Sequence, residues 1–115
     1  MTEKKDIIGL TENIKILGLK KEKELIARID SGATIGSIDK ALAEELELGP
    51  IIKEKLVKSS HGKSMRPVIK MRFILAKRQF NMNFTIADRS HLKYKILIGQ
   101  NVLKKNFLID PSRKV

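Results

Sequence analysis

Hydrophobic and polar residues alternate along much of the second half of the chain. In residues 69–75 most apolar side chains fall on every second position, and the same period returns in residues 80–86. A period of two is typical of a strand with one face on a hydrophobic core. Residues 77–78 separate the two runs, so we expect a tight turn there and an antiparallel hairpin around it.

Shorter apolar runs, each bounded by polar residues or glycine, predict the remaining strands. We expect strands over residues 13–19, 24–29, 33–38, 51–59, 96–98 and 107–109, and short helices over residues 40–46 and 100–105. Asp39 is the predicted N-cap of the first helix, and Gly49-Pro50 ends that segment. Many short strands and few helices favour an all-β protein, either a small closed barrel or a sandwich, with one or two short helices.

The composition fits one small domain. The chain has 115 residues, of which 42% are hydrophobic, and it has no cysteine, which excludes disulfides, thiolate metal ligands and cysteine nucleophiles. No apolar run is long enough for a membrane-spanning helix, and the first residues lack the apolar core of a signal peptide. We therefore expect a cytoplasmic protein that does not bind membranes. A chain this short would bury more apolar surface by pairing with a second copy.

The net charge of +11 belongs to the second half of the chain. Residues 51–115 contain 16 Lys and Arg against three Asp and Glu, whereas residues 1–50 contain 8 against 10. Such a positive surface suits an acidic protein segment or nucleic acid, or it only keeps the protein in solution. Aromatic residues make up 4% and tryptophan is absent, so base-stacking platforms are scarce and nucleic acid is disfavoured. Asp88 and Arg89 are adjacent, and we expect a local ion pair between them.

One carboxylate directly follows an apolar strand. The strand predicted to end at Ile29 is followed by Asp30-Ser31-Gly32. A carboxylate at the end of a buried strand is costly unless it is hydrogen-bonded or shares its charge, and groups in such places are candidates for catalysis. Taken alone, the same motif is also an ordinary turn in which aspartate accepts local backbone N–H groups.

The order of several segments resembles the retropepsin type of aspartic protease. Residues 29–33 read Ile-Asp-Ser-Gly-Ala, and residues 96–103 read Ile-Leu-Ile-Gly-Gln-Asn-Val-Leu. Residues 66–70 and 107–113 further resemble the retropepsin-like aspartic endopeptidase family whose members are named ATP-dependent zinc proteases. Together these segments span most of residues 14–113.

This resemblance implies a closed all-β barrel over residues 13–115, preceded by an N-terminal extension over residues 1–12. It also implies a homodimeric peptidase in which Asp30, Ser31 and Gly32 of each chain form the catalytic loop. The two aspartates would share one proton and activate water.

The resemblance gives roles to the neighbouring residues as well. The Ser31 hydroxyl would brace the paired loops, and Gly32 would let the backbone approach the carboxylates. Ile98 and Gly99 would cross behind the loop, where there is no room for a side chain. Substrate-binding residues are expected in the loop and in a mobile flap turn, namely Ala33, Ser59, Ser60, His61, Gly62 and Lys63.

The chain departs from the family pattern at Gln100, where many members have arginine, and this changes how the dimer is braced. We predict no metal and no cofactor, because His61 and His91 are isolated and there is no His-Glu-x-x-His motif. Residues 62–64 look like the end of a P-loop, but the first glycine of that motif would fall on Val57.

The expected flap is rich in positive charge. Its basic residues are Lys53, Lys55, Lys58, Lys63, Arg66, Lys70 and Arg72. A cleft with such an edge attracts acidic peptides, and relatives of the resembling family are associated with enzymes that ligate glutamate onto proteins. Our hypothesis is a peptidase that acts on acidic or glutamate-rich segments. The alternative is a non-catalytic retropepsin-like dimer that binds acidic protein segments or nucleic acid, with Asp30 kept for structure.

Overall fold

The computed structural model describes residues 4–60 and 62–114. The strands of these residues are β1 (Asp6–Ile8), β2 (Thr11–Leu17), β3 (Glu22–Ile29), β4 (Gly36–Asp39), β5 (Lys53–Ser59), β6 (Gly62–Leu75), β7 (Arg78–Ala87), β8 (Ile96–Ile98) and β9 (Phe107–Ile109), and the helices are α1 (Lys40–Glu45) and α2 (Gln100–Leu103). The two segments with period two form β6 and β7, the longest strands, which pair antiparallel. The predicted all-β protein with two short helices is confirmed.

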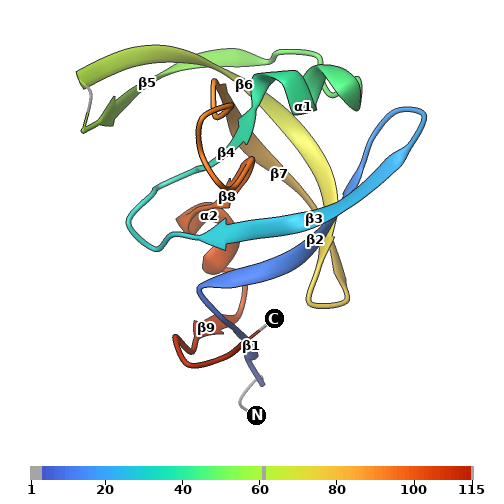
Figure 1. Ribbon diagram of the computed structural model, residues 1–115, viewed down its shortest axis with the longest axis vertical. Coiled ribbons are helices and arrows are strands. Elements are labelled where there is room, and N and C mark those ends of the chain that lie inside the picture. Colours follow the sequence, from blue (N-terminus) through green and yellow to red (C-terminus); the bar gives the residue numbers. More distant parts are fainter. Residues whose placement is uncertain (1–3, 61, 115) are drawn as a thin grey trace.

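Six of the described strands form a closed barrel (Figure 1). Their order around the ring is β2-β3-β8-β4-β7-β6, and a short antiparallel ladder between β2 and β6 closes the ring. The pairs β3–β8 and β4–β7 are parallel. β5 lies outside the ring and pairs with β6, so the β5–β6 hairpin extends beyond the barrel as an arm. We call this arm the flap.

The inward faces of β6 and β7 form the aromatic centre of the core. The Phe73 ring stacks on Phe80 with the centroids 5.2 Å apart, and it meets Phe84 edge to face at 5.4 Å. Phe73 and Phe84 are fully buried, together with the aliphatic side chains of Ile69 and Met71. Side chains therefore fill the interior, as is usual for a small barrel, and polar chemistry belongs to the loops at its edge.

The turn between β6 and β7 lies one residue earlier than the sequence predicts. Ala76 and Lys77 have φ values of 51° and 64°, and Arg78 already begins β7. Two consecutive residues in the left-handed region give a tight connection whose twist matches that of a hairpin. The Arg78 guanidinium lies over the rings of Phe80 and Phe107, 5.0 and 4.5 Å from their centroids. It thereby links the hairpin to β9.

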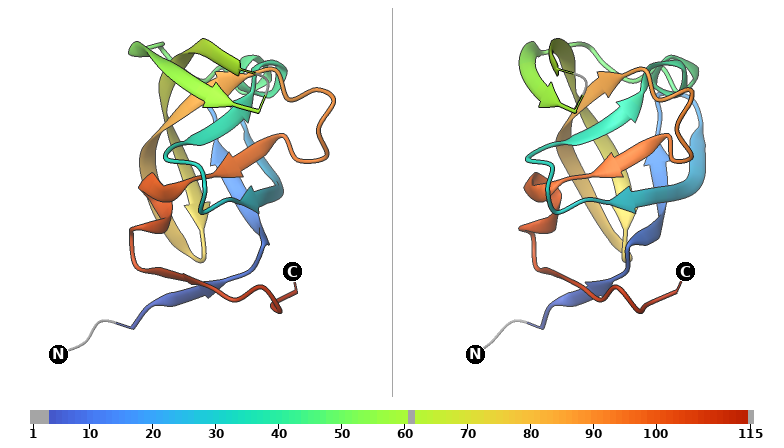
Figure 2. Two further views of the ribbon diagram at one scale, coloured as in Figure 1. Left: turned by 90° about the vertical axis from the view of Figure 1, so that its left-hand side faces the viewer. Right: turned by 60° about the vertical axis from the view of Figure 1, so that its left-hand side comes forward.

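The two ends of the described chain pair with each other. β1 and β9 form a parallel two-stranded sheet, the terminal ribbon, which Figures 1 and 2 show below the barrel. The buried Glu12 carboxylate accepts hydrogen bonds from the Gly9 N–H at 2.9 Å and from Arg113 Nε at 2.8 Å. Residues 1–12, expected as an extension, thus contain β1 and the start of β2.

The first helix starts after Asp39, as the sequence predicts, and ends at Glu45. The strand expected over residues 33–38 begins only at Gly36, which leaves residues 30–35 as a loop. No helix within residues 4–60 and 62–114 is both long enough and apolar enough to cross a membrane.

Candidate active site

Asp30 stands at the point where β3 leaves the barrel. Its backbone N–H donates to the Ile98 carbonyl at 2.9 Å, and the Ile29 N–H donates to the Leu10 carbonyl, also at 2.9 Å. These bonds fix the end of β3 between β8 and the segment that follows β1. The Asp30 carboxylate accepts the Gly32 N–H at 2.9 Å and is partly exposed. The backbone thus holds this carboxylate at the surface, with room for a further partner.

Ser31 and Gly32 form the exposed tip of the loop. A Cβ on Gly32 would lie 3.2 Å from Asp30 Oδ1, which is tighter than ordinary contact. The Ser31 carbonyl accepts a hydrogen bond from Gln100 Nε2 at 2.7 Å. Gln100, the residue that departs from the family pattern, therefore braces the loop of its own chain. The hydrogen bond keeps the loop in place without an arginine.

The apolar strand β8 and helix α2 support the loop from behind. A Cβ on Gly99 would come within 2.6 Å of the Ile35 carbonyl carbon and 2.9 Å of the Ala33 oxygen. The Gln100 N–H donates to that same Ala33 oxygen at 2.7 Å, and the Asn101 N–H donates to the Thr34 oxygen at 3.2 Å. Backbone thus packs directly on backbone, so residues 30–35 are held by β8 and the start of α2.

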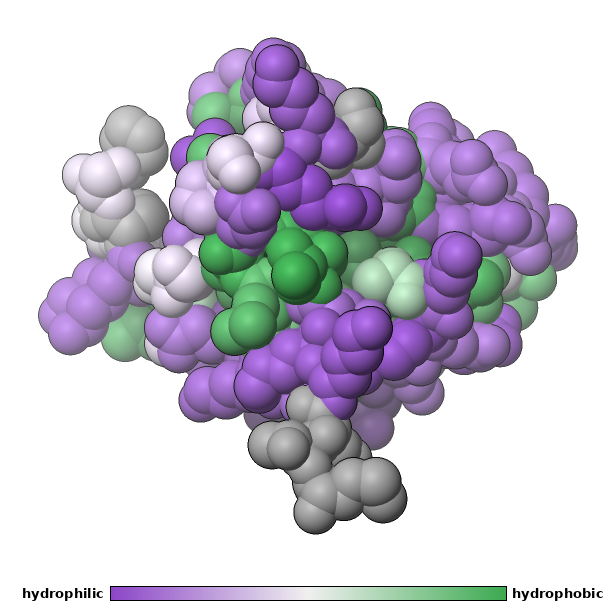
Figure 3. Space-filling model, turned by 90° about the horizontal axis from the view of Figure 1, so that it is seen from below, coloured by the Kyte–Doolittle hydropathy of each residue, from purple (hydrophilic) through white to green (hydrophobic). Residues whose placement is uncertain are grey.

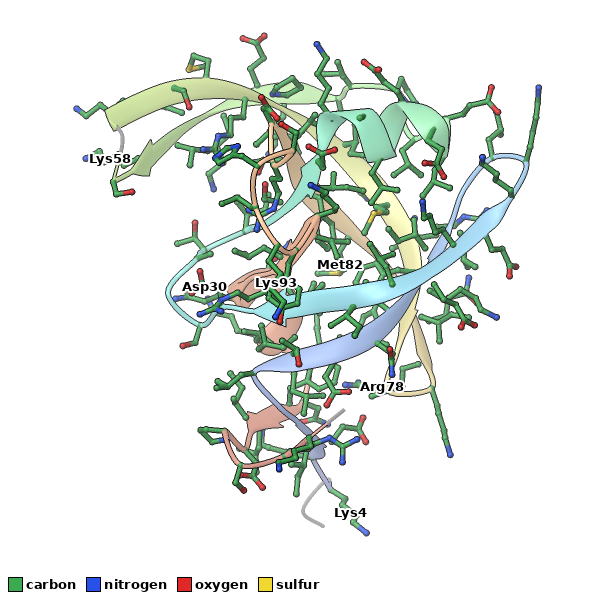
Figure 4. All side chains as sticks on the ribbon, in the orientation of Figure 1. Lys4, Asp30, Lys58, Arg78, Met82 and Lys93 are labelled. Carbon is green, nitrogen blue, oxygen red and sulfur yellow. The ribbon has the colours of Figure 1, made fainter. Side chains whose placement is uncertain are left out.

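A cleft of about 650 Å³ opens beside Asp30. It is lined by Asp30, Gly32, Ala33, Thr34, Ile35, Ser37, Lys55, Leu56, Val57, Lys58, Ser60, Arg66, Thr85, Ala87, Asp88, Arg89, His91, Leu92 and Leu97. These residues come from the Asp30 loop, from the flap, and from the wall formed by β4, β7, β8 and the loop after β7. Figure 4 shows Asp30 on the loop and Lys58 near the end of β5 on the same side of the molecule. The flap therefore overhangs the loop that carries the carboxylate (Figures 1 and 2).

The structure brings part of the predicted substrate-binding set to this cleft. Ala33 and Ser60 line it, whereas Gly62 and Lys63 do not. The Ser59 side chain and all of His61 lie outside the described part of the chain.

Only some of the basic residues predicted around the flap line the cleft. Among those predicted around the flap, Lys55, Lys58 and Arg66 line the cleft. The remaining four, Lys53, Lys63, Lys70 and Arg72, do not line it. Lys55, Lys58 and Arg66 belong to the ladder between β5 and β6, whereas Lys70 and Arg72 lie farther along β6, where it pairs with β7 and β2. The cleft still has a positive edge, because Arg89 joins these three cations.

The structure confirms Asp39 at the N-cap of α1, whereas the ion pair predicted for Asp88 is wrong. Asp39 occupies the N-cap position of α1 but makes no capping bond with its side chain, which instead accepts the Arg89 N–H at 2.7 Å. Asp88 forms no ion pair with Arg89 among the described residues. It accepts the Ser90 hydroxyl at 2.6 Å and the Ser90 N–H at 3.0 Å, which lowers the pKa of Asp88. Both carboxylates accept hydrogen bonds from the loop after β7, in place of a capping bond for Asp39 and an ion pair for Asp88.

Arg89 is a cleft residue that the sequence analysis did not assign to the site. Its Nε donates to the Tyr94 carbonyl at 3.0 Å, and its own carbonyl accepts Lys95 Nζ at 3.1 Å. Burial and the nearby Arg66 lower the pKa of Arg89, while Asp39 and Asp30 act in the opposite direction. Only the excess of positive charge in the second half pointed toward such a residue.

Within residues 4–60 and 62–114, no group of three or more histidine, aspartate, glutamate or cysteine side chains is placed to hold a metal ion. The acid that the cleft presents near the loop tip is the single carboxylate of Asp30, with Asp88 farther along the wall. One carboxylate can accept a proton. Activating water between two acids requires a second Asp30 from another copy of the chain.

Comparison with known proteins identifies the family and the fold. The family model described as RimB-like, retropepsin-like aspartic endopeptidase RimB, matches residues 39–115. The matched range begins after the Asp30 loop. The "Probable alpha-L-glutamate ligase" of Desulfotalea psychrophila (strain LSv54 / DSM 12343) is 28% identical over 64 residues, which are 55% of this chain and 14% of that protein.

Three solved structures have the same fold. The protein Lpg0085 of Legionella pneumophila, of unknown function, has a TM-score of 0.67 at 20% identity, with 95% of each chain covered. The simian foamy virus (mac) protease has a TM-score of 0.60 at 24% identity, covering 82% of this chain and 91% of the viral one. A foamy viral protease-reverse transcriptase, solved with an RNA/DNA hybrid, has a TM-score of 0.67 at 22% identity. The match covers 92% of this chain and 12% of the viral one. At these identities, the likeness establishes a retropepsin-like barrel.

Proposed function

Because this chain belongs to the RimB-like family of retropepsin-like aspartic endopeptidases, we propose that it hydrolyses peptide bonds as a homodimer with one Asp30 from each subunit. One observation carries the proposal. Asp30 sits on a loop braced by β8 and α2, with its carboxylate partly exposed at a cleft of about 650 Å³ under a β-hairpin.

The chemistry follows from placing two such carboxylates together. Two acids in close contact cannot both stay ionised, so the pair holds one proton over a useful pH range and titrates as a unit. The ionised Asp30 takes a proton from a water molecule between them, while the protonated Asp30 donates to the oxygen of the scissile carbonyl. Ser31 at the loop tip braces the paired loops, and Gly32 allows their close approach.

The terminal ribbon provides a surface for the second copy. Seen from the end that carries this ribbon, the molecule shows hydrophobic surface surrounded by hydrophilic side chains (Figure 3). Ile7 of β1 and Leu108 of β9 are register partners, and both are more than half exposed. Leu10, also exposed, follows β1 and bonds through its carbonyl to Ile29, next to the catalytic loop. A twofold axis through this end would therefore bring the two Asp30 loops toward each other.

We expect Leu108→Glu to dissociate the dimer and abolish hydrolysis together. The substitution puts a carboxylate from each copy into an apolar interface, which should raise the dissociation constant of the dimer at least about 30-fold, as for a central interface residue. Sedimentation and peptide hydrolysis would be measured over the same range of protein concentrations. The matched control is Leu19→Glu, at an exposed leucine in the β2–β3 turn at the other end of the barrel. If both variants remain dimeric and active, the terminal ribbon is not the dimer interface.

The substrate is an acidic or glutamate-rich segment, because cations line the cleft on both the flap and the wall. We expect kcat/KM to be at least about tenfold higher for a glutamate-rich peptide than for a glutamine-rich one of the same length at low salt. The difference should shrink as salt screens the exposed lysines. Hydrolysis of the two peptides would be followed at several salt concentrations. Equal rates that do not change with salt would contradict this specificity.

A further inference from the structure

Arg89 differs from the other cations of the cleft in how it is held. Lys55, Lys58 and Arg66 lie on the flap, an arm outside the closed barrel. Arg89 lies on the wall, where its N–H, its carbonyl and its Nε are all engaged in hydrogen bonds. Because its backbone and the first part of its guanidinium are hydrogen-bonded within the wall, the position of this arginine does not depend on the flap.

No carboxylate of the described residues forms an ion pair with the Arg89 guanidinium, although the charges of Asp39 and Asp30 attract it from farther away. Its Nε is taken by the Tyr94 carbonyl, while the ion pairs of these residues involve other side chains. Arg89 is half-buried and lines the cleft. A partly desolvated cation with no carboxylate in direct contact is unfavourable, and a carboxylate that enters the cleft would offset this cost. The two terminal amino groups of arginine match the two oxygens of a carboxylate.

A second polar group on the same wall also lacks a partner. The Ser37 hydroxyl is buried, has no hydrogen-bond partner in the described structure, and belongs to the cleft lining. The neighbouring Thr85 hydroxyl is already occupied by the Gly36 carbonyl at 3.2 Å. An unpaired buried hydroxyl is costly, so its presence beside a cleft points to an oxygen-bearing ligand.

The parallel pairing of β4 and β7 leads from Ser37 toward Arg89. Ser37 pairs with Thr85 and Asp39 with Ala87, and the chain then turns so that the Arg89 N–H meets the Asp39 carboxylate. Ser37 and Arg89 thus follow each other along the same strand pair. Ser37 is buried within β4, and Arg89 is half-buried just beyond the end of β7.

We propose that Arg89 and Ser37 form a subsite on the wall of the cleft that binds the side-chain carboxylate of a substrate residue close to the scissile bond. The inference rests on the proposed peptidase function and deepens it. A homodimer has this subsite twice, once on each side of the paired Asp30 loops. The chain therefore prefers acidic residues on both sides of the cleaved bond. A peptide with an acidic residue on one side only occupies one subsite and binds less tightly.

The test measures binding in the Asp30→Asn background, so that no peptide is cleaved. Binding of a fluorescent peptide of six glutamates would be compared with that of the matching peptide of six glutamines. Adding Arg89→Gln should weaken glutamate-peptide binding about 10- to 100-fold, the usual consequence of losing a charged hydrogen bond, and leave glutamine-peptide binding unchanged. Arg89→Lys, which keeps the charge but loses the planar fork, should fall between the two.

Arg72→Gln is the matched control, because it removes the same charge from an exposed arginine of β6 outside the cleft. It should change binding of either peptide less than about threefold, as expected for a distant exposed charge. Ser37→Ala should weaken binding of the glutamate peptide alone. The subsite is refuted if Arg89→Gln and Arg72→Gln act alike, or if Arg89→Gln weakens both peptides equally, as a loosened wall would.

The two proposals fail in different ways. If the Asp30→Asn protein binds the glutamate peptide through Arg89 but the unmodified chain hydrolyses nothing, the subsite stands and the peptidase function does not. If the unmodified chain cleaves peptides but Arg89→Gln leaves the preference for glutamate intact on both sides of the cut, the peptidase stands and the subsite is wrong.

Discussion

Asp30→Asn should lower peptide hydrolysis by about 10²- to 10⁴-fold, the range associated with loss of a general acid or base, while leaving the fold and the dimer unchanged. Asparagine has the same shape as aspartate, and its amide oxygen can still accept the Gly32 N–H that Asp30 Oδ1 accepts at 2.9 Å. What would be lost is the proposed pair of carboxyl groups that shares one proton. Hydrolysis rates, sedimentation and thermal unfolding of the variant would be compared with those of the unmodified chain.

Asp110→Asn is a closely matched control for this experiment. Like Asp30, Asp110 follows a strand and accepts the N–H of the residue two positions later, Ser112, at 2.9 Å. It is exposed and lies outside the cleft lining, so its replacement should leave the hydrolysis rate unchanged. Equal losses in both variants would mean that the turn, rather than the carboxylate of Asp30, sustains activity.

Mixing experiments extend the Asp30→Asn test to the dimer. If each site needs an aspartate from both subunits, an excess of the Asp30→Asn chain should capture the unmodified subunits in inactive mixed dimers, and activity per unmodified subunit should fall. Activity that does not change in the mixture would contradict a shared site. A chain that binds acidic peptides equally well with either residue, and cleaves none with aspartate, would instead be the non-catalytic binding module.

Gly99→Ala should lower the free energy of unfolding by about 1–3 kcal/mol, the usual cost of overpacking, and also lower activity. The φ of Gly99 is −106°, so alanine could adopt this backbone conformation without strain. The difficulty is space, because the new Cβ would lie 2.6 Å from the Ile35 carbonyl carbon and 2.9 Å from the Gly36 nitrogen. Backbone atoms cannot rotate away as a side chain can, so the loop that carries Asp30 must shift. Chemical denaturation and hydrolysis would be measured on the same preparation.

Gly32→Ala should separate the effect on stability from the effect on activity. At this exposed position the close neighbour of a new Cβ is the Asp30 side chain at 3.2 Å, and this side chain can move slightly. The free energy of unfolding should therefore change less than in Gly99→Ala. Activity should still fall, because the displaced atom is the carboxyl oxygen of Asp30 itself. If Gly99→Ala is as stable as the unmodified chain, the support of the loop by β8 is looser than the close contact at Gly99 suggests.

Features set by neighbouring residues could be predicted from the sequence. The alternation in β6 and β7 reflects which side chains face the core, and Asp30 does directly follow a strand. The closure of the barrel could not be predicted this way, since it joins Lys15 to Ile74 through backbone bonds that carry no side-chain signal. The terminal ribbon was predicted only in part, because β9 was expected over residues 107–109 whereas β1 was missed within the N-terminal extension.

Hydrogen bonds that the sequence does not reveal, one long-range and the others local, explain the differences at the site. Asp39 was assigned to the helix that follows it, yet its carboxylate binds the N–H of Arg89, 50 positions away. Arg89 was paired with its sequence neighbour, although its Nε binds a carbonyl five residues later. A sequence shows which donors are adjacent along the chain, whereas folding decides which donors are within reach. The catalytic assignment of Asp30 remains a prediction that the substitutions above address.

The parallel direction of the terminal ribbon has a consequence for longer polypeptides that include this barrel. Since β1 and β9 run the same way, the chain enters the ribbon at one end and leaves it at the other, as the positions of the two termini in Figure 2 illustrate. A module fused ahead of β1 and another fused behind β9 would emerge on opposite flanks. Neither would need to cross the mouth of the cleft, so the barrel could be inserted into a larger enzyme while its entrance stays open.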